Sequence, residues 1–140
     1  VYDRSRPETL DFMRRLRAVA DEYPDRMLLG EIECEEPLAR QLEYVRGTEA
    51  LHTAYSFFLL RAKAAAADTF RAALAGWTEA EGWPSWSLGN HDVPRFPSRL
   101  AGDDPGRTKL LLALLVMLRG TAFLYQGDEL GLPQAEVPRE

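Results

Sequence analysis

The sequence predicts an α/β fold in which helices alternate with short strands that form a parallel sheet. Apolar residues recur at helical spacing in several segments, short apolar runs lie between these segments, and the strands recur at intervals of roughly 30 residues. The chain has 140 residues, a length typical of one domain of roughly 100–200 residues. Its hydrophobic content of 46% is enough to form a buried core.

The first expected helix begins at Pro7, because proline suits the first position of a helix, where its missing N–H is not needed. Apolar residues at steps of three and four follow as far as Tyr23, and Pro24 ends the pattern. The next apolar run is short and ends in a carboxylate, Glu31. We expect it to form the first strand of the parallel sheet, over residues 27–31.

The remaining elements repeat this alternation. Asp104 and Pro105 mark a helix start, since aspartate caps a first turn and proline fits its first position. Asp68 is a candidate cap for the helix before it. The expected helices cover about residues 37–45, 68–77 and 105–118, and the expected strands lie near 53–57 (centred on 54–57), 85–89 and 121–126.

The four expected strands should lie side by side in sequential order, with right-handed connections. Four strands of this kind suit either a doubly wound sheet or half of an eight-stranded barrel. The glycine-rich phosphate-binding loops that favour the first arrangement are absent from the sequence.

Composition and charge exclude several classes of protein. The net charge of −5 disfavours a nucleic-acid partner, which needs a basic face. The single cysteine, Cys34, can form no internal disulfide and no cysteine-based zinc site. No apolar run approaches the length of a membrane span, and the N-terminal residues show no signal-peptide pattern, so we expect no membrane contact and a cytoplasmic location.

Polar residues gather directly after the expected strands, at the rim where parallel α/β barrels form their active sites. Glu31 follows the first strand, and Asn90, His91, Asp92 and Arg95 follow the third. Two tryptophans precede this second group and could pack on the C–H faces of a sugar, while its imidazole and carboxylate could bind hydroxyl groups. The other rim residues are expected to be a solvated loop (Glu33, Glu35, Glu36) or structural partners (Asp128, Glu129).

Each candidate also has a simpler interpretation. Glu31 could be a solvated charge at a strand end, because strand ends are commonly polar. The Asn90–Asp92 segment could be a turn, since asparagine and aspartate bind their own backbone in turns. Arg95 could contact a substrate or pair with a rim carboxylate. These alternatives stay open on spacing alone.

Three segments together resemble the α-amylase family of glycoside hydrolases, in particular its α-glucosidase and oligo-1,6-glucosidase branch. They are Gly30-Glu31, the hexapeptide Asn90–Arg95 (Asn-His-Asp-Val-Pro-Arg), and the segment from Gly120 to Glu129 (Gly-Thr-Ala-Phe-Leu-Tyr-Gln-Gly-Asp-Glu). Their order and spacing are similar to those of the family, which makes the combination more specific than any one motif.

The resemblance implies the C-terminal half (strands five to eight with their helices) of a (β/α)8 TIM-type barrel. Residues 1–140 would then be a partial catalytic barrel, from helix four through strand eight, and the first half and the C-terminal β domain would be absent. By the same resemblance Glu31 is the general acid/base, Asp92 stabilises the transition state, and His91, Asn90 and Arg95 bind the substrate. No metal ligand or cofactor is implied within this chain, and calcium in the complete enzyme finds no support in it.

The resemblance further implies a retaining α-glucosidase that acts on short α-linked gluco-oligosaccharides or disaccharides. The family's nucleophilic aspartate lies on the fourth strand, in a Gly-x-Arg-x-Asp segment that this chain lacks. We therefore expect the chain to be inactive alone and to self-associate through its exposed half-barrel edges. Glucosyl transfer or sucrose isomerisation, a non-catalytic amylase-like scaffold and an inactive half-barrel folding unit remain alternatives.

Overall fold

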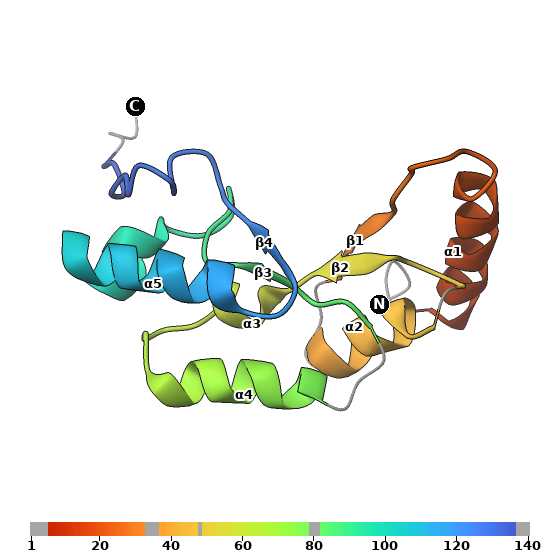
Figure 1. Cartoon of the computed structure of the whole chain (residues 1–140), viewed down its shortest axis with the longest axis horizontal. Coiled ribbons are helices and arrows are strands. Elements are labelled where there is room, and N and C mark those ends of the chain that lie inside the picture. Colours follow the sequence, from red (N-terminus) through yellow and green to blue (C-terminus); the bar gives the residue numbers. More distant parts are fainter. Residues whose placement is uncertain (1–5, 33–36, 48, 79–81, 137–140) are drawn as a thin grey trace.

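The computed structural model describes residues 6–32, 37–47, 49–78 and 82–136 (Figure 1). Helices and strands alternate over most of this length, which confirms the predicted α/β class. The strands are β1 (Leu29–Glu31), β2 (Thr53–Tyr55), β3 (Ser85–Ser87) and β4 (Thr121–Phe123). The helices are α1 (Pro7–Ala20), α2 (Pro37–Val45), α3 (Phe57–Leu60), α4 (Ala67–Thr78), the π-helical turn η1 (Pro97–Ala101) and α5 (Pro105–Met117).

The strands form two parallel pairs, β1 with β2 and β3 with β4, rather than the continuous four-stranded sheet that the sequence predicted. Between β2 and β3, where a continuous sheet would have backbone hydrogen bonds, side-chain hydroxyls donate hydrogen bonds to backbone carbonyls. Thr53 Oγ1 donates to the Trp83 carbonyl at 2.7 Å, and Ser85 Oγ donates to the Ala54 carbonyl at 2.5 Å. The order along the chain is preserved, but the ladder between β2 and β3 is replaced by these contacts.

The core lies between the strand pairs and the helices α3, α4 and α5. Trp86 and Leu88 of the β3 segment, Leu59 of α3 and Leu115 of α5 are all buried. The Trp86 ring packs edge-on against Trp77 of α4, with ring centres 6.5 Å apart, and its Nε1 donates to the Arg119 carbonyl at 2.8 Å. These contacts fix β3, and with it the loop that follows β3, against the helices.

Several local predictions are confirmed. Asp104 caps α5, since its carboxylate accepts a hydrogen bond from the Arg107 N–H at 2.7 Å, and Pro105 is the first helical residue. Pro7 begins α1 in the same way. α1 ends earlier than expected, at Ala20, and turns precede Asp25.

Other local predictions are wrong. The second strand covers 53–55 and not 54–57, because the Ser56 hydroxyl accepts the Phe58 N–H and starts the short helix α3. Asp68 lies inside the first turn of α4 instead of capping it, and pairs with Arg71 at 2.6 Å. The turn η1 was not expected at all. Its Arg99 side chain donates to the carbonyls of Ala62 and Leu88, two distant segments of the chain.

Each of the four strands has one edge without a backbone partner in the described part of the chain, and because β2 and β3 face each other, β1 and β4 are the outer strands. Exposed apolar side chains lie on or next to these outer strands: Leu29 is on β1, and Leu124 follows β4. Phe12 and Val19 are also exposed, on α1 at one end of the molecule in Figure 1. Exposed edges of this kind favour pairing with another chain.

We expect the isolated chain to self-associate, and Leu124→Lys to weaken that association, because a lysine beside the β4 edge opposes edge pairing. Sedimentation velocity measures the effect. Leu110→Lys is the matched control, since Leu110 is exposed on α5 and lines a separate hollow against α4. A monodisperse monomer over the whole concentration range would contradict the prediction.

Candidate functional site

A cleft of about 370 Å³ lies at the C-terminal ends of the strands, where the sequence predicted the active site. All four strand segments contribute to its wall: Gly30 and Glu31 from β1, Tyr55 from β2, Asn90 and His91 after β3, and Phe123 to Tyr125 at the end of β4. Residues separated by almost a hundred positions in the sequence therefore meet in one concavity.

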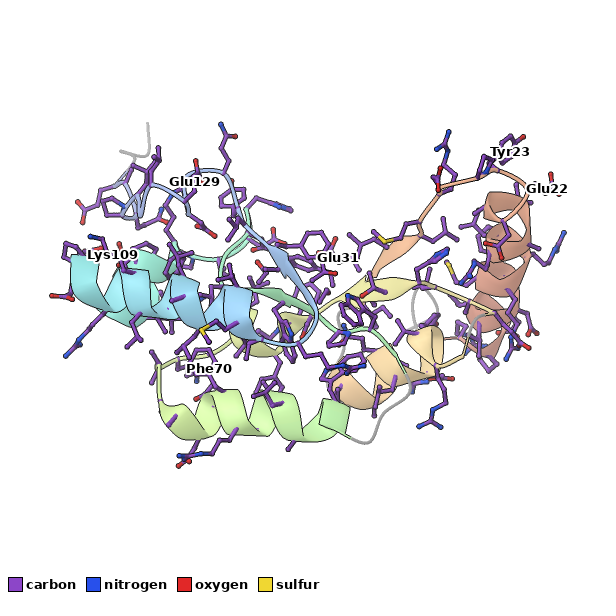
Figure 2. The ribbon with its side chains drawn as sticks, viewed as in Figure 1. Glu22, Tyr23, Glu31, Phe70, Lys109 and Glu129 are labelled. Atoms are coloured by element: carbon purple, nitrogen blue, oxygen red, sulfur yellow. The ribbon has the colours of Figure 1, made fainter. Side chains whose placement is uncertain are left out.

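Glu31 is the last residue of β1, and its side chain is exposed at the cleft. Figure 2 shows it near the centre of the molecule, between the two strand pairs. The preceding residue must be small, because a Cβ atom at Gly30 would lie 2.3 Å from Leu51 Cδ1. Gly30 thus lets β1 pack closely on Leu51 and brings Glu31 to the rim.

Tyr55 lies in the cleft and was missed by the sequence analysis. Its hydroxyl donates to the Gly89 carbonyl at 3.3 Å, and its ring packs edge-on against Phe123, 5.9 Å between ring centres. Burial raises the pKa of the Tyr55 hydroxyl, and the charges of Glu31, Asp128 and Asp92 act in the same direction. The phenol is therefore held in its neutral, hydrogen-bonding form among three carboxylates.

The Asn90–Asp92 segment forms a tight turn at the rim. Asn90 is buried, and its side-chain oxygen accepts the Asp92 N–H at 2.9 Å, which is the turn geometry typical of asparagine. His91 and Asp92 project outward and are exposed, with 3.4 Å between His91 Nε2 and Asp92 Oδ1. A turn and a binding role are thus compatible for this segment, because buried Asn90 forms the turn on which His91 and Asp92 are exposed.

Asp92 contributes to a second hollow beside the cleft that Glu31 lines. This hollow has a volume of about 350 Å³ and is also lined by Arg95 and Gln134. The two hollows share Asn90, His91 and Tyr125 as a common wall.

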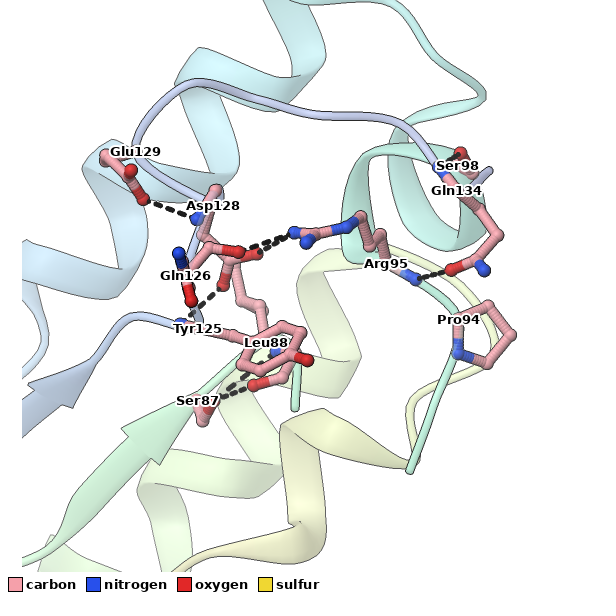
Figure 3. A network of polar contacts seen from close by, with 12 residues as sticks. Ser87, Leu88, Pro94, Arg95, Ser98, Tyr125, Gln126, Asp128, Glu129 and Gln134 are labelled. Carbon is pink, nitrogen blue, oxygen red and sulfur yellow. Dashed lines mark hydrogen bonds and ion pairs between the residues drawn. The ribbon is translucent and has the colours of Figure 1, made fainter. Parts of the chain in front are cut away.

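Arg95 pairs with the rim, one of the two roles considered from the sequence. Its Nη1 donates to the Gln126 carbonyl at 2.8 Å and lies 3.9 Å from Asp128 Oδ1 (Figure 3). Its guanidinium carbon lies 5.2 Å from the centre of the Tyr125 ring. The backbone N–H of Arg95 donates to the Gln134 side chain at 2.9 Å. These bonds connect the loop after β3 to the segment after β4.

Asp128 is fully buried beneath this connection. Its Oδ2 accepts the Tyr125 N–H at 3.0 Å, while its Oδ1 makes no hydrogen bond among the described residues. Burial raises the pKa of the Asp128 carboxyl, and the Tyr125 hydrogen bond and the charge of Arg95 only partly oppose that shift. Glu129 was likewise expected to be structural, and its Oε2 accepts the Gly127 N–H at 2.8 Å.

The raised pKa of Asp128 predicts a defined pH dependence of stability. The folded state favours the neutral Asp128 carboxyl. The contribution of this carboxyl to the free energy of unfolding is therefore complete below the ordinary aspartate pKa of about 3.9, and it is lost as the pH rises through the pKa of the folded state. Relative to Asp128→Asn, the wild-type free energy of unfolding should therefore fall with rising pH and then level off. Urea unfolding of both proteins across pH 3 to pH 8 measures this difference, and a difference that grows with pH would contradict it.

The two tryptophans expected beside the sugar pocket lie elsewhere. Trp86 is part of the core, and Trp83 Nε1 donates to Thr121 Oγ1 at 2.8 Å, at the start of β4 and away from the cleft. The aromatic rings that do line the cleft are those of Tyr55, Phe123 and Tyr125. The sequence analysis gave these three rings no role, and their position at the C-terminal ends of β2 and β4 was the signal that could have identified them.

Some predicted features lie outside the described residues, namely Glu33, Cys34, Glu35 and Glu36. Among the residues that are described, no group of three or more His, Cys, Asp or Glu side chains is arranged to hold a metal ion. None of the helices in the described ranges has the length and apolar character needed to cross a membrane.

The chain is an α/β domain with a cleft at the C-terminal ends of its parallel strands, and comparison with known proteins identifies its family. The family described as "Alpha amylase, catalytic domain" matches residues 1–140. The chain therefore belongs to the α-amylase family, as its three motifs indicated, and aligns with part of the family's catalytic domain.

Named relatives are α-glucosidases and oligo-1,6-glucosidases. The chain is 39% identical over its whole length to a "Probable alpha-glucosidase" of Rhizobium meliloti (strain 1021), of which it covers 26%. It is 41% identical over 43% of its length to the oligo-1,6-glucosidase of Parageobacillus thermoglucosidasius, of which it covers 11%. The chain thus spans about a quarter or less of the length of these relatives.

Solved structures agree with this assignment. The α-glucosyl transfer enzyme XgtA superposes with a TM-score of 0.90 at 42% identity over 99% of this chain and 26% of that enzyme. An inactive double mutant of MutB in complex with isomaltulose superposes with a TM-score of 0.79 at 27% identity, over 95% of this chain and 27% of MutB. Family members of this kind bind sugars such as sucrose and isomaltulose.

Proposed function

We propose that this chain is the C-terminal half of the catalytic barrel of a retaining α-glucosidase, with β1 to β4 as the fifth to eighth barrel strands. Its substrates are short α-linked gluco-oligosaccharides or disaccharides. The proposal rests chiefly on one observation: Glu31 and His91, which come from different strands of an α-amylase family chain, line the same cleft at the strand ends.

In this proposal Glu31 is the general acid/base. It protonates the leaving glycosidic oxygen and then accepts a proton from the water that attacks the glycosyl intermediate. Its exposure at the cleft rim supports this role, because both steps need contact with a bound sugar and with water. The nucleophile that forms the intermediate lies outside this chain in the proposed enzyme.

His91 and Asp92 bind the sugar hydroxyls. Asp92 binds more tightly as the sugar ring flattens, so its contribution is largest in the transition state. Both side chains are exposed on one turn that buried Asn90 supports, which suits groups that must meet a ligand without moving. Asn90, which lines both hollows, contributes to substrate binding. Arg95 contributes from the second hollow.

Glucosyl transfer is the second candidate, and the high similarity to XgtA favours it. Hydrolysis and transfer share the glycosyl intermediate and differ only in the acceptor, which is water in one case and a hydroxyl compound in the other. The residues described here serve both reactions.

The experiment is to incubate the complete protein with maltose, isomaltose, sucrose and a nitrophenyl α-glucoside. Proton NMR of the first-formed product identifies its anomer, and chromatography detects transfer products. Retention of the α-configuration is the expected result. An inverted product, or no turnover of any α-glucoside, would refute the proposal.

A further inference from the structure

Asp128 is a buried acidic residue that the proposed reaction does not use. It is fully inaccessible, yet it binds the backbone of Tyr125, which lines both hollows. We propose that Asp128 is a positioning residue that holds the 89–95 loop, which carries His91 and Asp92, in place against Tyr125. The effect of this positioning on catalysis rests on the proposed α-glucosidase activity.

The carboxyl group contacts both sides of the connection. On its own side, Oδ2 accepts the Tyr125 N–H at 3.0 Å. On the opposite side, Oδ1 lies 3.9 Å from Arg95 Nη1, and Oδ2 lies 3.4 Å from where a Cβ atom of Gly89 would be. The carboxyl therefore lies within van der Waals reach of position 89, where the loop begins.

Arg95 transmits this contact to the loop. Besides facing Asp128, its guanidinium donates to the Gln126 carbonyl and stacks over Tyr125. Position 127 is a glycine with φ +94°, and a Cβ there would lie 2.9 Å from Arg95 Nη1, so the turn is shaped to admit the guanidinium. The side chain of Arg95 thus occupies a site built by residues 126–128.

The other charged and titratable groups that face Asp128 are Arg99 of η1, Glu129 of its own turn and Tyr55 of β2. Arg99 donates to the Leu88 and Pro94 carbonyls, so its bonds hold the two ends of the same loop. Glu129 accepts the Gly127 N–H, and Tyr55 donates to the Gly89 carbonyl. Arg95 is therefore the cation whose position depends most directly on Asp128.

Asp128→Asn in the complete protein tests the role. The amide keeps the size of the side chain and an oxygen for the Tyr125 N–H, but it places either an uncharged oxygen or a donor N–H₂ against the Arg95 guanidinium. We expect kcat for an α-glucoside to fall about 10–100-fold, since a misplacement of about 1 Å can cost roughly 100-fold. KM should rise much less, because Asp92 acts mainly in the transition state.

Arg95→Met should produce a similar loss, and the double variant should lose little more than either single variant, as for two residues of one unit. Arg95→Lys, which keeps the positive charge, should restore part of the activity that Arg95→Met loses. Asp68→Asn is the matched control. Asp68 is exposed in the first turn of α4, where it pairs with Arg71, and it has no bond to the 89–95 loop among the described contacts.

Hydrogen–deuterium exchange gives a readout that needs no activity. Exchange in residues 89–95 should accelerate in Asp128→Asn and stay unchanged in Asp68→Asn. If the wild-type protein turns over no α-glucoside, the proposed function fails, and the exchange comparison still decides whether Asp128 positions the loop. Unchanged exchange in 89–95, or wild-type kcat in an Asp128→Asn protein of an active enzyme, would overturn the inference.

Discussion

Glu31→Gln in the complete enzyme should reduce kcat for maltose by about 10²–10⁴-fold, the usual contribution of general acid–base catalysis. Glutamine has nearly the same size as glutamate and keeps the cleft filled, but it cannot deliver a proton to the glycosidic oxygen. Because Glu31 ends a strand and lies exposed at the rim, the substitution leaves the core contacts of β1 unchanged. Circular dichroism and initial rates on the same preparation separate folding from chemistry.

The leaving group sharpens this test. A nitrophenolate departs without protonation, so nitrophenyl α-glucoside should lose less in the glycosylation step than maltose does. Glu22→Gln is the control, since Glu22 is an exposed carboxylate beyond the end of α1, remote from Glu31 in Figure 2. Equal losses for both substrates, or a similar loss in Glu22→Gln, would contradict the acid/base role of Glu31.

The sequence predicted those parts of the fold that have strong local signals. Asp104 and Pro105 start α5 through interactions within one turn, so their meaning does not depend on the rest of the chain. The turn η1 depends on distant partners, because Arg99 binds carbonyls at Ala62 and Leu88. The contacts between β2 and β3 likewise join distant segments, since the hydroxyls of Thr53 and Ser85 donate to carbonyls about 30 residues away.

The site was predicted in outline for a similar reason. Glu31 and His91 stand in motifs that can be recognised, and their positions at strand ends placed them at the rim. Tyr55 has no motif, and an aromatic residue in a short strand is typical of a core, so its place in the cleft needed the three-dimensional structure. The side-chain bond from Asn90 to the Asp92 backbone closes the turn, and a residue count along the chain does not reveal it.

The chain by itself should hydrolyse no α-glucoside at a measurable rate. A retaining glycosidase uses two carboxyl groups about 5–5.5 Å apart, one as acid/base and one as nucleophile. In the proposed arrangement Glu31 supplies the first, whereas Asp92 lines the adjoining hollow and stabilises the transition state. Acid–base assistance of about 10²–10⁴-fold falls far short of the accelerations of roughly 10⁶–10¹⁷-fold that enzymes reach.

Complementation provides the measurement. Co-expression of this chain with a first-half fragment of a related α-glucosidase should restore turnover of a nitrophenyl α-glucoside, because the added fragment supplies the proposed nucleophile and the missing wall of the cleft. Glu31→Gln in this chain should then lower the restored rate, while Glu22→Gln should not. Turnover by the isolated chain that is unaffected by Glu31→Gln would show that both the half-barrel assignment and the acid/base assignment are wrong.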